Sequence, residues 1–136
     1  MADRFQLEVA TPERLFVQED VSYAELPGKD GYLGVLAGHA PLLGRLGVGV
    51  LSYEQDGQKH VLAVDGGFIE IFENHVSVLA DYAEPARDIQ VDQARRELEQ
   101  GQQEVDRAKT EQESGTALAH AARAQARLDA AQQVGS

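Results

Sequence analysis

The side chains best suited to acid–base or metal chemistry in this sequence are four histidines. Histidine titrates near neutral pH and is the commonest metal ligand, so its spacing is informative. No two of them lie at the spacing of a metal-binding pair. The sequence has no G-x-S-x-G motif and no cysteine, so it lacks a recognisable serine or thiol nucleophile. We therefore expect no catalytic residue and no metal site. The histidines are His39, His60, His75 and His120.

Two arginines near the carboxyl terminus are a second candidate for chemistry. Arg123 and Arg127 are one helical turn apart and would share a helix face. Two guanidinium groups in that arrangement can hold a phosphate. The phosphate-binding loop G-x-x-x-x-G-K-[ST] is absent, because Gly28-Lys29 is not preceded by the required glycine. The alternative interpretation is that the arginines belong to a solvated helix surface whose charged side chains form salt bridges. The other basic residues of the predicted helices, which have the same interpretation, are Arg95, Arg96, Arg107 and Lys109.

The overall charge excludes several classes of partner. The formal net charge is −11, which argues against nucleic acid, since phosphate binding depends on Lys and Arg. The same charge argues against direct insertion into an anionic lipid surface. No apolar run approaches the roughly 20 residues that cross a bilayer, and the amino terminus lacks a secretion signal. The absence of cysteine fits a reducing compartment, so we expect a cytoplasmic setting.

Composition changes abruptly near residue 86. Every proline lies at or before Pro85, and every aromatic residue lies at or before Tyr82. Beyond Arg87 the chain is rich in Ala, Gln, Glu and Arg, which favour helices. Because proline and most glycine mark turns, whereas runs of Ala, Glu, Gln and Arg make long helices, we predict two units, residues 1–86 and residues 87–136.

The first unit is predicted to be a β-sandwich. Phe5, Leu7 and Val9 alternate with polar residues, as in a strand with one buried face. Asp56-Gly57 is a strong hairpin signal, because a two-residue primed turn needs positive φ at both centres. Short runs separated by frequent turns indicate an antiparallel sandwich of about ten strands, including separate strands before and after Gly66-Gly67. The fold class is therefore α+β, mainly β.

The second unit is predicted to be a pair of antiparallel helices. Apolar residues recur at alternating spacings of three and four, which gives one narrow stripe along each helix. Gly115 is expected to end the first helix, and Thr116 to cap the second. The seam is mostly alanine and glycine, so it buries little apolar area and should separate from the sandwich easily. The stripes are Val91, Ala94, Leu98, Gly101, Val105 and Ala108, then Ala117, Ala121, Ala124, Leu128 and Ala131.

Three segments resemble the epsilon subunit of bacterial F-type ATP synthases. Residues 31–43 are similar to its G-x-L-G-hydrophobic-x-x-G-H-x-P-L-L segment, with every fixed Gly, His and Pro present. Residues 64–71 resemble its hydrophobic-S-G-G-F-hydrophobic-E-V segment, with Asp65 in place of the usual serine. Residues 74–81 resemble its N-x-V-T-V-L-A-D strand. The likeness covers essentially the whole chain in order.

The resemblance implies a rotor subunit that performs no bond chemistry. Such a subunit sits at the foot of the central stalk, binds gamma and rests on the ring of c subunits, at the cytoplasmic face of the bacterial cell membrane. It couples proton-driven rotation to ATP synthesis. By resemblance, Tyr32 stands where glutamate is common in the loop that reaches the c ring. The contacts with gamma and the c ring implied in this way are Lys29, Asp30, Tyr32, His39, Pro41 and Leu42.

The resemblance also implies that the two helices are regulatory. In many bacterial members it either folds against the sandwich or extends along gamma, and the extended form inhibits ATP hydrolysis. Basic residues on these helices can then meet acidic segments of gamma and of the catalytic alpha and beta subunits. In this sequence the resemblance implies this role for Arg95, Arg96, Arg123 and Arg127.

Some members also bind ATP through an (I/L)-D-x-x-R-A motif. The ungapped register places residues 89–94 on it and loses both the Asp and the Arg, while it keeps Arg123 and Arg127 on the family's arginines. A shift of two residues recovers Asp92 and Arg95 but puts Arg96 at the Ala position. We expect no cofactor, with ATP as a regulatory ligand the alternative.

Two other classes of function stay open at this point. A free-standing adaptor, with the sandwich and the hairpin each binding a different protein, fits the two-unit organisation. A small hydrolase fits less well, since no nucleophile, metal cluster or carboxylate pair is recognisable.

Overall fold

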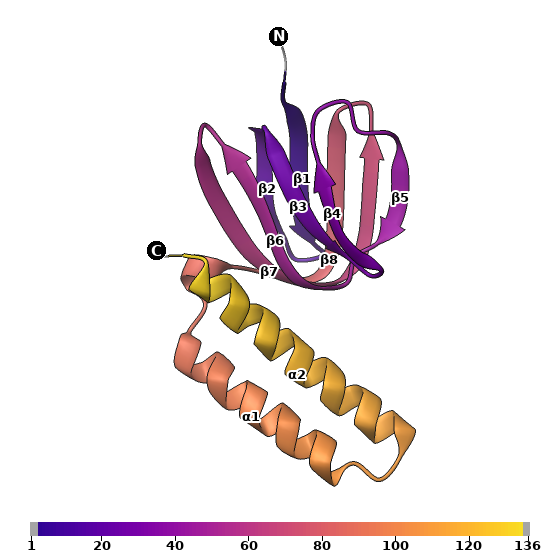
Figure 1. Cartoon of the computed structure of the whole chain (residues 1–136), viewed down its shortest axis with the longest axis vertical. Helices are drawn as coiled ribbons and strands as arrows, with labels where there is room; N and C mark the ends of the chain where they lie inside the picture. Colours follow the sequence, from indigo (N-terminus) through magenta and orange to yellow (C-terminus); the bar gives the residue numbers. More distant parts are fainter. Residues whose placement is uncertain (1–2, 135–136) are drawn as a thin grey trace.

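The computed structural model describes residues 3–134 and has a β-sandwich followed by two helices (Figure 1). The order of a mainly β unit before a helical pair is as predicted. The strands are β1 (Phe5–Thr11), β2 (Arg14–Val21), β3 (Tyr23–Gly28), β4 (Gly31–Val35), β5 (Leu42–Arg45), β6 (Val48–Gln55), β7 (Gln58–Phe72) and β8 (His75–Pro85). The helices are η1 (Ala86–Asp88), α1 (Val91–Arg107) and α2 (Glu111–Gln132).

The described residues form eight strands, fewer than the about ten predicted from the turn signals. One reason is that β7 runs through Gly66 and Gly67, where separate strands were expected. The two glycines adopt positive φ of 76° and 122°, so the strand bends there without ending. A Cβ at Gly67 would lie 1.9 Å from the carbonyl oxygen of Leu79, so only glycine lets β8 approach this closely.

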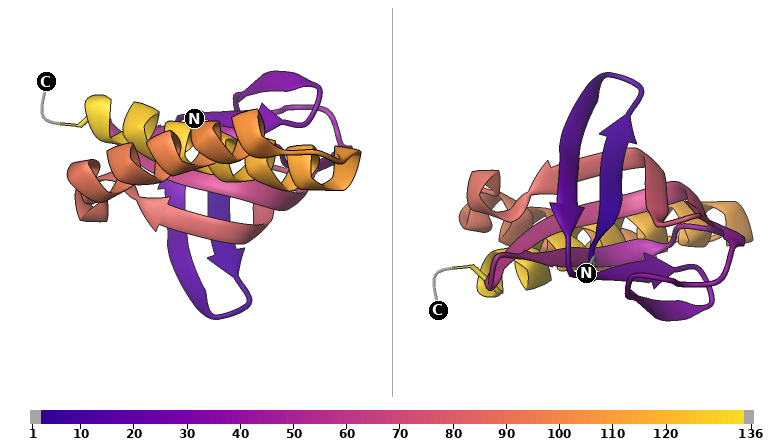
Figure 2. Two further views of the ribbon diagram at one scale, coloured as in Figure 1. Left: turned by 90° about the horizontal axis from the view of Figure 1, so that it is seen from below. Right: turned by 90° about the horizontal axis from the view of Figure 1, so that it is seen from above.

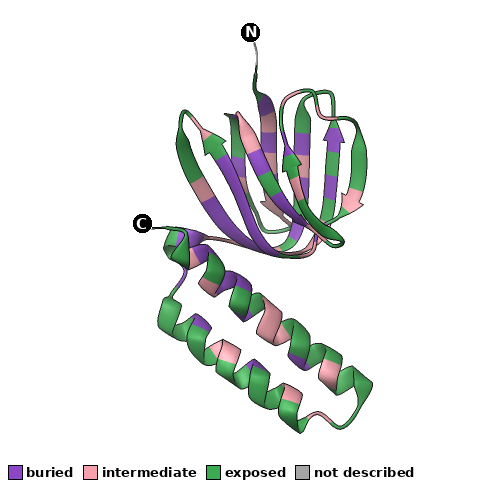
Figure 3. Ribbon diagram, viewed as in Figure 1, coloured by how far each residue is buried: buried purple, intermediate pink, exposed green. Residues whose placement is uncertain are grey.

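The strands follow the order β2-β1-β8-β7-β6-β3-β4, with β5 also paired to β7. All pairs are antiparallel except β1 with β8, which is parallel. The sandwich is therefore antiparallel as predicted, apart from this one pair. Phe5, Leu7 and Val9 point into the core, which confirms the alternation seen in the sequence. Figure 3 shows the buried positions alternating with exposed ones along the strands.

The connection between the helices lies at residues 108–110, so the turn predicted at residues 114–116 is wrong. Thr110 accepts a hydrogen bond from the backbone N–H of Glu113 at 3.0 Å, and the Glu113 side chain accepts one from the N–H of Lys109 at 2.9 Å. These bonds satisfy donors that the start of a helix otherwise leaves unpaired. The glycine expected to end the first helix lies inside α2, because this cap outweighs the helix-breaking tendency of one glycine.

Small residues hold the two helices close together. Ala94 and Gly101 on α1 are buried, as are Ala117 and Ala124 on α2. A Cβ added to Gly101 would lie 2.9 Å from the Cα, Cβ and N atoms of Ala121. The predicted alanine and glycine seam is therefore confirmed.

The helical pair packs on the sandwich through α2, which lies against β6 and β7 (Figure 2). Val50, Val61 and Ala63 point outward from these strands and are buried beneath the helices together with Ala94 and Ala130. The strip of α2 that docks on the strands was not predicted, because the sequence pattern suggested a single stripe facing α1. The helices thus cover one outer face of the sandwich.

Candidate partner surfaces and the hairpin contact

The part of the sandwich that the helices leave uncovered carries exposed apolar side chains. Phe68 on β7 lies opposite Leu79 on β8, and these residues are 55% and 58% exposed. Leu43 on the neighbouring β5 is 78% exposed. We call this surface the uncovered face. Its large apolar members are Leu15, Leu43, Phe68, Phe72 and Leu79.

These positions follow directly from strand geometry. Successive side chains of a strand point to opposite faces, so the buried Ile69 and Ile71 face the core while Phe68 and Phe72 face outward. The outward face of a solvated sheet is usually polar. An apolar outward face is instead typical of a surface that another protein covers.

The predicted c-ring contacts lie in the turn between β3 and β4. Lys29 and Asp30 are exposed there, and the Lys29 N–H donates a hydrogen bond to the carbonyl oxygen of Arg45 at 3.0 Å. Tyr32 is 57% exposed, yet its hydroxyl accepts a hydrogen bond from the backbone N–H of Val50 at 2.9 Å. The turn is thus tied to β5 and β6 while its charged side chains face solvent.

His39 and Pro41 lie in the connection between β4 and β5, at the other end of these strands. The His39 Nδ1 atom is 2.7 Å from the carbonyl oxygen of Ala40. The neighbouring N–H of Gly38 donates to the Asn74 side-chain oxygen at 2.6 Å, which ties this connection to the turn between β7 and β8. Leu42, the first residue of β5, is 37% exposed. The structure therefore separates the predicted contacts into two groups, one at each end of β4.

Arg127 is the centre of the contact between α2 and the rest of the chain. Its side chain is 9% exposed, and its Nε donates to Glu84 at 2.9 Å. Its Nη1 donates to Glu97 on α1. The Tyr82 hydroxyl also donates to Glu84. Burial raises the pKa of Tyr82, and the hydrogen bond to Glu84 adds to this rise, so the phenol stays protonated.

Arg123 makes a second contact one turn earlier on α2. Its Nε donates to Asp65 on β7 at 2.8 Å, and its guanidinium carbon lies 4.4 Å from the centroid of the Tyr82 ring. This geometry is a cation–π interaction beside an ion pair. We call Asp65, Tyr82, Glu84, Arg123 and Arg127 the hairpin latch.

The two arginines share a helix face, as predicted. Each guanidinium group, however, already forms an ion pair with a carboxylate of the same chain. A nucleotide phosphate would have to displace Asp65 and Glu84 from their guanidinium partners. The arginines predicted on α1 lie elsewhere. Arg95 forms an exposed ion pair with Asp92 at 3.3 Å, and Arg96 is exposed.

The two acidic residues of the hairpin latch were not predicted from the sequence. Asp65 differs from the serine usual in the segment that residues 64–71 resemble, but this difference alone indicates no partner for its carboxylate. Glu84 stands beside Pro85 at the junction and carries no local signal of its role. Asp65 is 58 residues from Arg123 and Glu84 is 43 from Arg127, so only folding brings these charges together.

Comparison with known proteins identifies the family. Residues 4–86 match the family model described as ATP synthase, Delta/Epsilon chain, beta-sandwich domain. The ATP synthase epsilon chain of Solibacter usitatus is 49% identical over 128 residues, which are 94% of this chain and 96% of that relative. The chain belongs to the ATP synthase epsilon chain family. The epsilon chain of Carboxydothermus hydrogenoformans is 42% identical over 107 residues, 79% of this chain and 80% of that relative.

Solved structures share the fold of this family member. A chain in the Euglena gracilis mitochondrial ATP synthase, with OSCP, F1 and the c-ring in rotational state 1, superposes with a TM-score of 0.84 at 22% identity, covering 97% of this chain and 83% of that one. A chain in the Tetrahymena thermophila central stalk and c-ring gives 0.69 at 13% identity, covering 93% and 95%.

Membership confirms the predicted family and makes the chain a non-catalytic subunit of ATP synthase, since the complex is the enzyme. Within residues 3–134, no helix has both the length and the hydropathy needed to span a bilayer.

Proposed function

We propose that this epsilon chain sits at the foot of the central stalk, binds gamma through its uncovered face, and couples proton-driven rotation of the c ring to ATP synthesis. The observation that carries this proposal is the uncovered face itself. One outer face of the sandwich is buried beneath α2, whereas the other carries five large apolar side chains that are about half exposed or more. A protein that works alone rarely leaves such a surface open to water.

The membrane itself is reached through the complex, at its cytoplasmic face. The acidic chain is unsuited to insertion into anionic lipid. The turn with the exposed Lys29 and Asp30 is proposed to contact the c ring. Because both side chains are charged, this turn is better suited to a polar, transient interface than to an apolar, permanent one. Nucleic acid is not a partner on the same charge argument.

The test of the gamma contact is the double substitution Phe68→Ser with Leu79→Ser. Aromatic and aliphatic anchors near the centre of an interface each contribute roughly 1–2 kcal/mol or more, so gamma binding should weaken about 100-fold. The unfolding temperature should hardly change, since both side chains face outward. The matched control is Leu118→Ser, which removes a leucine of similar exposure, 55%, from α2. Equal binding by the two variants would refute this assignment of the surface.

The c-ring contact is tested separately by reversing two charges, Lys29→Glu with Asp30→Lys. The substitution keeps the net charge, and both side chains are exposed, so folding should be unaffected. We expect lower proton-driven ATP synthesis by the reconstituted complex, with unchanged assembly on gamma. Synthesis at the wild-type rate would count against contact at this turn.

The helices are proposed to inhibit ATP hydrolysis when they leave the sandwich and meet gamma and the alpha and beta subunits. What supports this is the nature of the docked contact. It consists of a small apolar cluster and the hairpin latch, both of which a competing surface can replace. The basic residues freed by undocking, Arg123 and Arg127, would then be available to acidic partner segments.

A reversible covalent lock tests this inhibition. The chain has no cysteine, so Ala63→Cys on β7 with Ala130→Cys on α2 introduces the sole thiol pair. Both alanines are buried in the cluster between the strands and the helices, so a link between them joins the two units of the docked chain. Linking these thiols, directly or through a reducible linker, should tie α2 to the sandwich, prevent undocking, and raise hydrolysis by the complex; reduction should restore inhibition. Hydrolysis that is the same in both redox states would exclude an extended inhibitory form.

We further propose that the docked hairpin needs no cofactor and does not bind ATP as a regulatory ligand. Asp65 and Glu84 satisfy the guanidinium groups internally, so phosphate gains little by replacing them. Calorimetric titration of the chain with MgATP should give no saturable heat. Binding at millimolar or tighter affinity would reverse this proposal without affecting the two preceding ones.

A further inference from the structure

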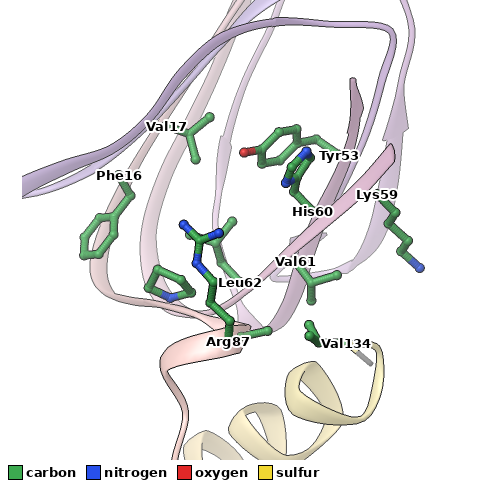
Figure 4. A pocket seen from close by; sticks show the side chains of 11 residues that line it. Phe16, Val17, Tyr53, Lys59, His60, Val61, Leu62, Arg87 and Val134 are labelled. Atoms are coloured by element: carbon green, nitrogen blue, oxygen red, sulfur yellow. The ribbon is translucent and has the colours of Figure 1, made fainter. Parts of the chain in front are cut away.

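A cavity of about 230 Å³ lies where the sandwich, η1 and the end of α2 meet (Figure 4). Parts of the chain that are distant in sequence supply its walls. Phe16 comes from β2, Tyr53 from β6, Leu62 from β7, and Val134 follows α2. Neither arginine of the hairpin latch lines the cavity, so it is distinct from the candidate phosphate-binding face.

The charge of this cavity is opposite to that of the whole chain. Arg87, His60 and Lys59 line it, and its described lining includes no carboxylate. The chain carries 23 acidic residues against 12 Lys and Arg, so a cavity lined only by basic charged groups stands out. In Figure 4, Arg87 extends toward Tyr53 and His60, whereas Lys59 points away. Arg87 takes part in none of the ion pairs of residues 3–134.

An aromatic pair forms one wall beside Arg87. The rings of Tyr53 and His60 are stacked, with centroids 4.9 Å apart and planes inclined by 18°. Burial raises the pKa of Tyr53, the Glu19 carboxylate adds to the rise, and the charge of Arg87 opposes it. The Tyr53 hydroxyl therefore stays protonated, and the guanidinium is close enough for its field to act on the phenol.

We propose that this cavity binds a small organic anion: a carboxylate or phosphate on an apolar body about the size of one aromatic ring. Arginine is the side chain best suited to hold such a group, because its planar guanidinium donates two parallel hydrogen bonds. Phe16, Leu62 and Val134 supply apolar walls for the body. An engineered cavity of roughly 150 Å³ holds benzene, so about 230 Å³ accommodates a ring together with its charged group.

An occupant of this cavity would contact both units of the chain. Tyr53 and Leu62 belong to the sandwich, whereas Val134 belongs to the end of the helical pair. A ligand that binds only when both walls are present stabilises the docked hairpin by mass action. This consequence rests on the proposed mobility of the hairpin, but the binding site does not.

The test is a titration of the full chain with phenyl phosphate, followed by NMR of backbone and side-chain resonances. We expect saturable shifts at Arg87, His60 and Leu62, with a Kd on the order of 1 mM or tighter for a ligand of this size. Arg87→Gln should weaken binding at least tenfold. Arg96→Gln is the matched control, since it removes the same charge from an exposed position on α1 and should leave the Kd unchanged.

Two further probes separate the charge from the apolar body. Inorganic phosphate lacks the body and benzyl alcohol lacks the charge, so each should bind at least tenfold more weakly than phenyl phosphate. Binding of inorganic phosphate as tight as that of phenyl phosphate, or a Kd that Arg87→Gln does not change, would overturn the site.

Hydrogen exchange of α2, measured with and without phenyl phosphate, tests the consequence for the hairpin. Slower exchange with the ligand is expected. Binding without slower exchange would refute the link to docking and leave the anion site standing, so a failure of the site and a failure of hairpin mobility give different results.

Discussion

At the scale of single residues, Arg127 makes two of the ion pairs that join α2 to the rest of the chain. A guanidinium withdrawn from water needs charged partners, because an unpaired buried charge is strongly unfavourable. Glu84 on β8 and Glu97 on α1 supply them. One side chain of α2 therefore joins the sandwich to both helices.

The first prediction concerns the loss of this charge. Arg127→Met keeps an apolar stem but leaves Glu84 and Glu97 without their cation. Hydrogen bonds to charged groups contribute about 1.5–3 kcal/mol, so amide exchange in α2 should become roughly 10- to 150-fold faster. Exchange in the strands should stay as in the wild type, because their core is separate.

Adding Glu84→Gln to Arg127→Met is the matched control for this substitution. It removes the unpaired carboxylate and should recover part of the protection of α2. Exchange that is equally fast in the strands and the helices would contradict the assignment, since it would mean that Arg127 stabilises the whole fold.

The second prediction concerns alkaline pH at Tyr82. Burial, followed by the hydrogen bond to Glu84, raises its pKa above the value near 10 of an unfolded chain. The stability that this contributes is therefore complete below pH 10 and is lost as pH rises from 10 toward the folded pKa. Tyr82→Phe should make the fall in unfolding free energy above pH 10 shallower by at most about 1.4 kcal/mol per pH unit.

Chemical denaturation at pH 7 and at several values above 10 measures this effect. Tyr53, whose pKa is also raised by burial, titrates in the same direction, so the slope should decrease without vanishing. Identical slopes for Tyr82→Phe and the wild type would show that the phenol is as free in the folded chain as in the unfolded one.

At the scale of elements, local cap chemistry decides where α2 begins. Thr110 and Glu113 satisfy backbone donors at residues 109–113, so the helix starts before the glycine that looked like a terminus. Gly115 then occupies an ordinary exposed helical position, with no atom within 4 Å of an added Cβ.

The third prediction tests this start directly. Inside a helix, Gly115→Ala should stabilise the hairpin by about 1 kcal/mol, because alanine loses less conformational entropy than glycine. At a left-handed cap the same substitution would destabilise it, since the added Cβ disfavours positive φ. Hydrogen exchange of the helix amides shows whether Gly115→Ala stabilises or destabilises the hairpin. A decrease in their protection would favour a turn at residues 114–116.

The fourth prediction concerns the seam between α1 and α2. Gly101→Leu forces a side chain into a space where a Cβ already meets Ala121 at 2.9 Å. Overpacking of this kind typically costs about 1–3 kcal/mol, so the helices should lose protection while the strands keep theirs. Gln102→Leu adds the same side chain at an exposed neighbouring position and should have little effect. Equal loss in both variants would mean that added bulk, not the seam, is responsible.

At the scale of the whole molecule, the sandwich has two apolar outer faces and covers only one with its own chain. The helices bury Val50, Val61 and Ala63, whereas the uncovered face stays open for a partner. Under the proposed function, the uncovered face is the surface for gamma, and the other face is the one that the hairpin exposes when it undocks.

The fifth prediction follows from that division. Deleting residues 88–136 should leave a folded sandwich that self-associates, because a second apolar surface becomes exposed. Val61→Asp in the shortened chain should restore the monomer, since it places a charge in the middle of that surface. Sedimentation velocity measures both results, and a monodisperse monomer without the added charge would contradict the prediction.

The sequence by itself determined the parts of this protein that depend on neighbouring residues. Strand alternation at Phe5 to Val9, the change from strand to helix after Pro85 and the small-residue seam are local patterns whose physical cause lies within a few residues. The family also followed from three short segments. The helix turn was misplaced even so, because two local signals competed and the cap at Thr110 was the stronger.

Only the tertiary structure decided which surfaces are open and which charges meet. The uncovered face exists because β5, β8 and the part of β7 from Phe68 onward lie side by side on the side that the helices do not bury, and a strand pattern alone cannot say which neighbour covers it. The latch joins Asp65 to Arg123 and Glu84 to Arg127 across 58 and 43 residues, and the cationic cavity likewise gathers distant segments. Electrostatic and packing energies depend on distance in space, which the order of residues does not specify until the chain folds.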